Sequence, residues 1–142
     1  MTAATGPSRV ELSIPATVEW LALARTTGAA VAARLSFNYD EITDLRLAID
    51  ELCLTLVEGA PATRLEISFE AVGDVLEVEG RAVGVGLGTP VALQNGQAGA
   101  DIVLSSDLSA RILDALVDEH GADEAGDTRR AWLRKQRSTE HA

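Results

Sequence analysis

The stretch Phe37–Pro61, FNYDEITDLRLAIDELCLTLVEGAP, determines the fold, because it has the start, the periodicity and the end of one long amphipathic helix. Asn38 is a favourable N-cap, and Glu41 follows three residues later, which is the spacing of a capping box. Gly59 and Pro61 end the helix. Apolar residues recur at intervals of three and four, so they form one buried stripe: Ile42, Leu45, Ile49, Leu52 and Leu56.

A second line of residues runs beside this stripe, about 100° around the helix at 3.6 residues per turn. It contains Asp44, Ala48, Glu51 and Thr55. Glu51 and Thr55 are therefore one turn apart on the shoulder of the buried face. A carboxylate in this position can face a cleft instead of bulk water, so Glu51 is the first candidate for a functional residue.

The stretch resembles the corresponding helix of the serine-kinase anti-sigma factors of the RsbW type, which belong to the GHKL ATPase superfamily. The positions that match in register are Leu45, Ala48, Glu51, Cys53, Val57 and Ala60. The resemblance implies that Glu51 is the general base. It also implies a magnesium ligand at the position of Thr55, where the family has Asn.

Two elements are expected before this helix. Val10–Ile14 alternates apolar and polar residues and predicts a strand that ends at Pro15. Thr17 can cap a helix that continues to about Leu35. Gly28 in mid-helix favours close approach of another element. This order, with Ile14-Pro15 before the first helix, also resembles the RsbW type.

After Pro61, Arg64–Glu70 and Val75–Glu79 predict two strands that form an antiparallel hairpin across Val72-Gly73-Asp74. Residues 80–104 are rich in glycine and predict a long loop. By resemblance this region is the nucleotide lid; alternatively, it is a loop that closes nothing. Asp107 or Ser106 would cap a third helix, Leu108–Glu119, which Gly121 would end. Ala122–Gly126 is a weak strand segment, and a last strand is expected over Thr128–Gln136.

These elements predict an α+β fold in which helices cover one face of a mixed, mostly antiparallel sheet. The resemblance implies that this two-layer sandwich is the histidine-kinase-like ATPase fold. We expect a disordered segment at 1–8, a single domain over 9–137 and a tail at 138–142.

The amino-acid composition and net charge limit the classes of function that the protein can have. The chain of 142 residues has a net charge of −10, which opposes nucleic-acid binding. Its basic cluster is either a solvated strand face or a contact to an acidic partner: Arg129, Arg130, Arg134, Lys135 and Arg137.

Targeting and metal-binding signals are weak. No apolar run is long enough for a membrane span, and residues 1–9 lack the pattern of a signal peptide, so we expect a cytoplasmic protein. One Cys and two His predict no zinc site and no internal disulfide. Cys53 is expected to be an inert core thiol.

By resemblance, a GHKL nucleotide site also requires an adenine-binding Asp after the third strand and a glycine-rich turn before the last helix. The sequence has Gly80 and Arg81 in place of the Asp, and Arg accepts no hydrogen bond. It has Asp107-Leu108-Ser109-Ala110 in place of the turn. The run Gly84-x-Gly86-x-Gly88 lacks the context of a phosphate loop. The sequence therefore predicts a degenerate nucleotide site with no cofactor; ATP with Mg²⁺, held by Glu51 and Thr55, is the alternative.

The resemblance implies a cytoplasmic anti-sigma factor of the bacterial stress response that forms a homodimer. It would sequester an alternative sigma factor, and an anti-anti-sigma factor would release it. Two alternatives remain. One is an active serine kinase that phosphorylates the anti-anti-sigma factor with Glu51 as base. The other is a non-catalytic domain of this fold that binds another ligand or only dimerises.

Overall fold

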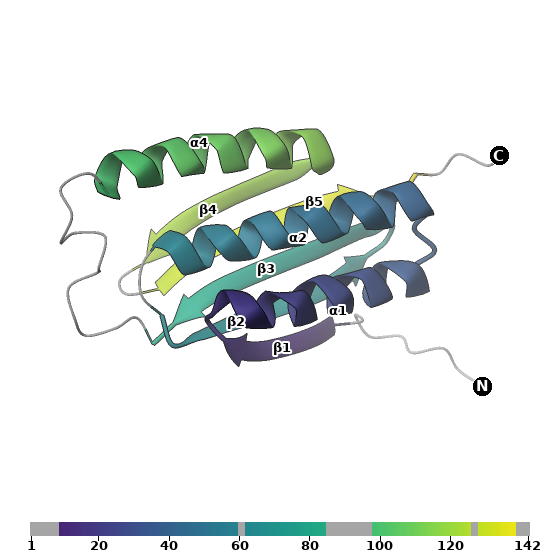
Figure 1. Ribbon diagram of the computed structural model, residues 1–142. Coiled ribbons are helices and arrows are strands. Elements are labelled where there is room, and N and C mark those ends of the chain that lie inside the picture. Colours follow the sequence, from purple (N-terminus) through teal and green to yellow (C-terminus); the bar gives the residue numbers. More distant parts are fainter. Residues whose placement is uncertain (1–8, 60–61, 85–97, 126–127, 139–142) are drawn as a thin grey trace.

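The computed structural model describes residues 9–59, 62–84, 98–125 and 128–138, which form two layers (Figure 1). Three α-helices cover one face of a five-stranded sheet. The elements in chain order are β1 Arg9–Pro15, the 3₁₀ helix η1 Val18–Trp20, α1 Leu21–Arg34, α2 Tyr39–Gly59, β2 Arg64–Val72, β3 Val75–Val83, α4 Ala98–Leu116, β4 Glu119–Ala125 and β5 Thr128–Gln136.

The sheet has the strand order β1-β2-β3-β5-β4, and its four pairings are all antiparallel. This confirms the predicted two-layer α+β sandwich. The hairpin of β2 and β3 turns at Gly73-Asp74, where Gly73 has φ of 61°. A residue without Cβ adopts this left-handed conformation at little cost. The predicted last strand, Thr128–Gln136, is confirmed with the same bounds.

The core lies between α2 and the sheet. Leu45, Ile49, Leu52 and Leu56 of the predicted stripe are buried, and Ile42 is partly buried against them. The sheet supplies the opposite side with alternate residues of its strands: Ile14, Leu65, Ile67, Phe69, Leu76, Val78, Ala131 and Leu133. Full burial of a Leu or Ile side chain contributes about 1.5–3 kcal/mol, so this contact dominates the stability of the fold.

Gly28 brings α1 against α2, as its position in mid-helix predicted. A Cβ atom at Gly28 would lie 2.2 Å from Cδ1 of Ile49 and 3.2 Å from a ring carbon of Phe69. Such distances leave no room for a side chain. Glycine therefore allows α1 to approach both α2 and the sheet.

The start of α2 has the predicted capping box. The backbone N–H of Glu41 donates to Oδ1 of Asn38, and the backbone N–H of Asn38 donates to Oε1 of Glu41, both across 2.8 Å. The cap predicted at Thr17 is wrong in detail. Thr17 precedes η1, and its side chain makes no capping hydrogen bond; its hydroxyl contacts the Glu19 carboxylate instead.

Two predictions after the hairpin are wrong. The third helix begins at Ala98, so Asp107 and Ser106 lie inside α4 and do not cap it. The helix ends at Leu116, and Glu119–Ala125 forms the edge strand β4, in which Gly121 pairs with Trp132. The predicted loop over 80–104 is therefore shorter, because 80–83 belong to β3 and 98–104 to α4. The nucleotide lid predicted there falls mainly on 85–97, which lie outside the described residues.

Candidate functional site

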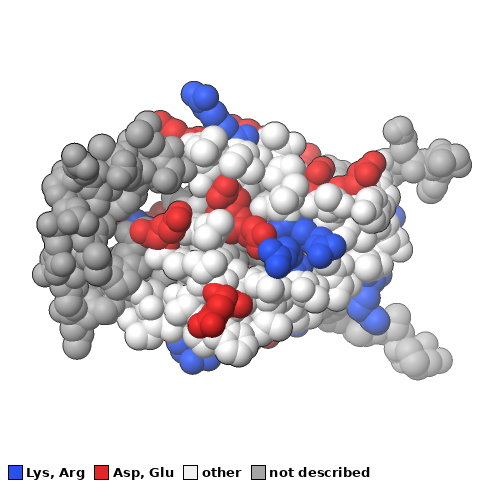
Figure 2. Space-filling model, viewed as in Figure 1, with Lys and Arg blue, Asp and Glu red and all other residues white. Residues whose placement is uncertain are grey.

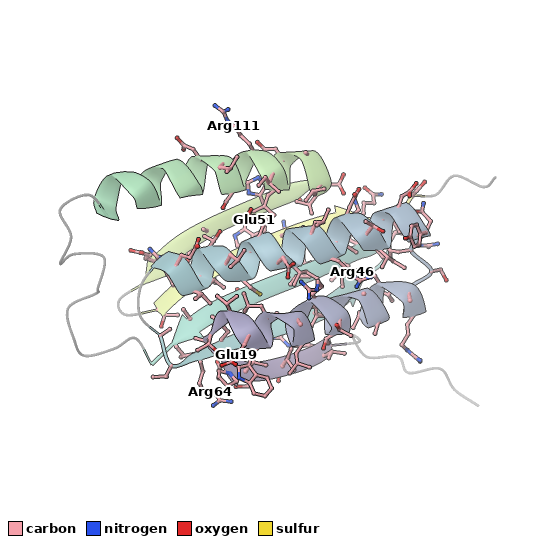
Figure 3. The ribbon with its side chains drawn as sticks, viewed as in Figure 1. Glu19, Arg46, Glu51, Arg64 and Arg111 are labelled. Atoms are coloured by element: carbon pink, nitrogen blue, oxygen red, sulfur yellow. The ribbon has the colours of Figure 1, made fainter. Side chains whose placement is uncertain are left out.

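Glu51 and Thr55 lie on the side of α2 that faces α4. The opposite side of α2 contacts α1, where Arg25 of α1 donates to the Asp50 carboxylate across 2.7 Å. Figure 3 shows Glu51 projecting from α2 on the α4 side. Both Glu51 and Thr55 are partly exposed. The structure thus places them where the helical periodicity predicted, on the shoulder of the buried stripe.

The hydroxyl group of Thr55 is engaged with its own helix. It donates a hydrogen bond to the backbone carbonyl oxygen of Glu51 across 2.9 Å. This geometry holds the Thr55 oxygen against the backbone, whereas Mg²⁺ requires ligands that converge on one point. Among the described residues, no group of three or more His, Cys, Asp or Glu side chains could hold a metal ion.

The resemblance assigns adenine binding to the position of Gly80 and Arg81. Neither residue offers a side-chain hydrogen-bond acceptor on the side of the sheet that faces α2 and α4. Gly80 is buried beneath α2, and a Cβ atom there would lie 2.7 Å from Leu56 and 3.0 Å from Leu52. Arg81 is exposed and lines a depression on the opposite face of the sheet. Gly80 therefore serves helix–sheet packing, and the guanidinium of Arg81 is separated from α2 by the sheet.

The four residues that the sequence aligned with a phosphate-binding turn are helical instead. Asp107-Leu108-Ser109-Ala110 lies within α4, where backbone N–H groups are bonded to carbonyl groups one turn earlier. These N–H groups cannot cradle phosphates. Gly84 has φ of 64°, and Gly86 and Gly88 lie outside the described residues. The described residues therefore do not fit ATP with Mg²⁺.

The basic cluster near the C-terminal end is neutralised by carboxylates of neighbouring strands. Arg130 contacts both Glu79 and Asp123, and its hydrogen bond lowers the pKa of the Asp123 carboxyl group. Arg134 contacts Glu77 and Glu119 in the same way. The other pairs are Arg129 with Glu124 and Arg137 with Asp74. These pairings favour the interpretation of the cluster as a strand face over that of a contact for an acidic partner.

The helix-free face of the sheet has two adjoining depressions of about 290 and 260 Å³. Both are lined by Arg9, Ser68 and Glu79. Trp132 borders the second, with the Arg134 guanidinium 5.0 Å from its ring centroid. Positive and negative side chains alternate across this face, so it presents no single charge to a ligand.

Lys135 was not singled out as a separate residue by the sequence, yet it joins three elements. Its Nζ donates to the carbonyl oxygen of Leu116 at the end of α4 across 2.8 Å and lies 3.8 Å from Asp44 of α2. A cation here also satisfies the partial negative charge of the α4 C-terminus. The sequence indicated Lys135 only as a member of the basic cluster and by its position in β5, on the same face as Leu133.

Fold and site together define a class: a two-layer α+β sandwich whose central helix carries a carboxylate on the side of the last helix. Proteins named serine-protein kinase RsbW from Bacillus cereus (strain B4264) and Bacillus thuringiensis subsp. konkukian (strain 97-27) are 38% identical to this chain over 73 residues, 49% of this chain and 46% of each relative. One from Bacillus thuringiensis (strain Al Hakam) is 44% identical over 52 residues, 37% of this chain and 32% of the relative.

These matches confirm the resemblance to the RsbW type. The chain spans about half the length of the curated relatives it matches. No family model matches the chain. None of the helices in the described part of the chain has the length and apolar character of a membrane span.

Proposed function

We propose that this protein is an anti-sigma regulatory protein that binds and sequesters an alternative sigma factor. The observation that carries the proposal is the similarity to proteins named serine-protein kinase RsbW, together with the matching α+β fold. An anti-anti-sigma factor would release the sigma factor by competing for the protein. The proposal includes a cytoplasmic location, a homodimer and a role in the bacterial stress response.

The protein would act without efficient use of ATP. This part of the proposal is supported by the hydroxyl of Thr55, which is held on the backbone of Glu51, and by Gly80 and Arg81 at the adenine position. Phosphoryl transfer depends on positioning the nucleotide and on neutralising its charge. Without these residues, regulation would depend on competition between two protein partners.

The test is affinity capture of the tagged protein from its own host, with and without added ATP and Mg²⁺, followed by mass spectrometry. We expect a sigma factor in both samples at equal recovery. Recovery that depends on ATP would contradict nucleotide-independent binding. If neither a sigma factor nor an anti-anti-sigma factor is recovered, the proposed function is wrong and the resemblance extends to the fold alone.

A second candidate function, a serine kinase acting on the anti-anti-sigma factor, is favoured by Glu51, which occupies the position of the general base. Its test is phosphate transfer from radiolabelled ATP to the recovered anti-anti-sigma factor. Transfer that is lost in Glu51→Gln and retained in the neighbouring Asp50→Asn would establish the kinase. No transfer by the unmodified protein excludes it.

A further inference from the structure

The surface of α2 between its outward side and the side that faces α4 carries two parallel lines of residues with seven-residue spacing. Leu47 and Leu54 form the first line. Asp44, Glu51 and Glu58 form the second. Residues seven apart lie nearly above one another in an α-helix, so each line runs along the helix axis. We call these five residues the outer stripe of α2.

Much of the outer stripe is exposed or lacks an ion pair within the part of the chain that the structure describes. Leu47 is 53% exposed, Leu54 is partly buried and Glu58 is exposed. Neither Glu51 nor Glu58 forms an ion pair with another residue that the structure describes, whereas Asp50 on the α1 side is paired with Arg25. Asp44, in contrast, forms an ion pair with Lys135 across 3.8 Å. The stripe thus combines one half-exposed and one partly buried Leu with two carboxylates, Glu51 and Glu58, that have no ion-pair partner among the described residues.

The negative charge of the chain is concentrated on its helices. α2 alone contains six carboxylates and one Arg. The helices together contain ten carboxylates and four Arg, while the strands contain eight carboxylates and seven cationic side chains. Figure 2 shows this side of the molecule, on which acidic patches are separated by uncharged surface and by basic patches, one of which lies near the centre of the view.

We propose that the outer stripe of α2 binds a cationic amphipathic helix of a partner protein. The inference rests on the proposed function, since it assigns a contact surface and a ligand chemistry to sigma-factor binding. The seven-residue interval between Leu47 and Leu54 corresponds to one heptad of paired helices. The flanking line of carboxylates matches Lys or Arg beside the apolar residues of the partner. A second copy would bring the same carboxylates together, and an anionic membrane surface would be repelled.

A synthetic helical peptide of Leu and Lys, with Leu repeating at intervals of three and four, is the probe. Its binding to the full chain is followed by fluorescence anisotropy. Leu47→Ser and Glu58→Lys change the stripe at residues whose exposure leaves the fold intact. Leu23→Ser and Glu19→Lys are matched controls on α1 and η1, where Leu23 is 44% exposed and Glu19 is exposed.

We expect each stripe variant to weaken peptide binding by about tenfold and each control by less than about twofold, because Leu47→Ser removes an apolar contact and Glu58→Lys reverses a charge that faces the cationic peptide. Equal weakening by stripe and control variants would show non-specific attraction to the net charge and overturn the proposal. Equal binding of a peptide with Glu in place of Lys would also overturn it, as would the absence of saturable binding. Circular dichroism confirms that each variant is folded.

The same variants separate this inference from the proposed function. If the unmodified protein captures a sigma factor, and Leu47→Ser and Glu58→Lys capture it equally, the outer stripe is not the contact and the proposed function stands. Loss of capture in the stripe variants, with the controls unaffected, supports both. If the unmodified protein captures no sigma factor while the peptide discriminates between variants, the stripe stands and the proposed function fails.

Discussion

The hydroxyl oxygen of Thr55 and the carbonyl oxygen of Glu51 are joined by a hydrogen bond of 2.9 Å within α2. The residue at the magnesium-ligand position therefore satisfies a backbone group of its own helix. An Asn at this position has a longer side chain, whose carbonyl can project away from the backbone. The bond supports the proposal that this helix resembles the RsbW type without providing a nucleotide site.

We expect ATP with Mg²⁺ to leave the thermal stability of the protein unchanged. A ligand at a hundred times its dissociation constant stabilises a protein by about 2.7 kcal/mol, which would raise the melting temperature of a chain of this size by about 10 °C. Differential scanning fluorimetry at millimolar nucleotide should show a shift below about 1 °C. A larger shift that disappears in Glu51→Gln would demonstrate a functional nucleotide site.

Gly28→Val should destabilise the protein by about 1–3 kcal/mol, because the new side chain would overlap Ile49 and Phe69 at the closest approach of α1. Urea denaturation followed by circular dichroism measures the free energy of unfolding. Ala30→Val on the exposed side of α1 is the control, and its cost should be limited to the helix propensity of Val, about 0.6 kcal/mol. Equal losses in both variants would mean that the two helices are not in close contact at Gly28.

Asn38→Ala removes one half of the capping box and should cost about 1 kcal/mol of unfolding free energy. Glu41 would still accept a hydrogen bond from the backbone N–H of Ser138 through its second carboxylate oxygen. Thr43→Ala, one turn further along α2, is the control and should be neutral or slightly stabilising. A neutral Asn38→Ala variant would contradict the observed cap.

Cys53 should make the stability fall in alkaline solution. Burial, and secondarily the Asp50 carboxylate, raise the pKa of its thiol from 9.0 to about 12. The unfolded chain therefore loses this proton first, and the free energy of unfolding falls as pH rises from about 9 toward 12, by at most about 1.4 kcal/mol per pH unit.

The comparison of the protein with Cys53→Ala isolates this contribution, because all other titrating groups are shared. The difference in unfolding free energy between the two should change over the same pH range. In the native state, the thiol should react with a thiol reagent only as fast as the protein opens. Identical pH profiles, or rapid modification at pH 8, would show that the thiol is accessible.

The sequence predicted the centre of the fold well, because α2 is specified at every level. Its cap, its apolar period and its terminal Gly agree with one another, and local and tertiary preferences coincide there. The hairpin of β2 and β3 was equally predictable, since period-two alternation flanks a Gly-Asp turn. The position of Glu51 followed from α2 alone, and the function of that carboxylate stays a prediction.

The edge strand β4, Glu119–Ala125, was only weakly indicated by its own residues, as a weak segment over Ala122–Gly126. Glu119–Ala125 has low strand propensity, and it is stabilised by the residues of β5 that pair with it. Glu119, Asp123 and Glu124 pair with arginines of β5, and the Trp132 ring lies over Gly121. Such cross-strand pairs exist only once the register is set.

The start of α4 was not predicted because a local signal in the sequence was misleading. Ser106 and Asp107 have the side chains of a favourable N-cap, although the helix has already begun at Ala98. Ser and Asp occur within helices when tertiary packing favours the helix, and α4 packs along α2. Local polar residues therefore could not decide where this helix begins.

The unequal charge of the two layers gives the described part of the molecule an electric dipole, with its negative end on the helices. The field of a cationic protein exerts a torque on this dipole, which turns the helical side toward the approaching surface before any contact forms. The torque acts over a distance that shrinks to about 8 Å at physiological ionic strength. Orientation in solution is thus a property of the whole charge distribution, and it is independent of the fit at any one residue.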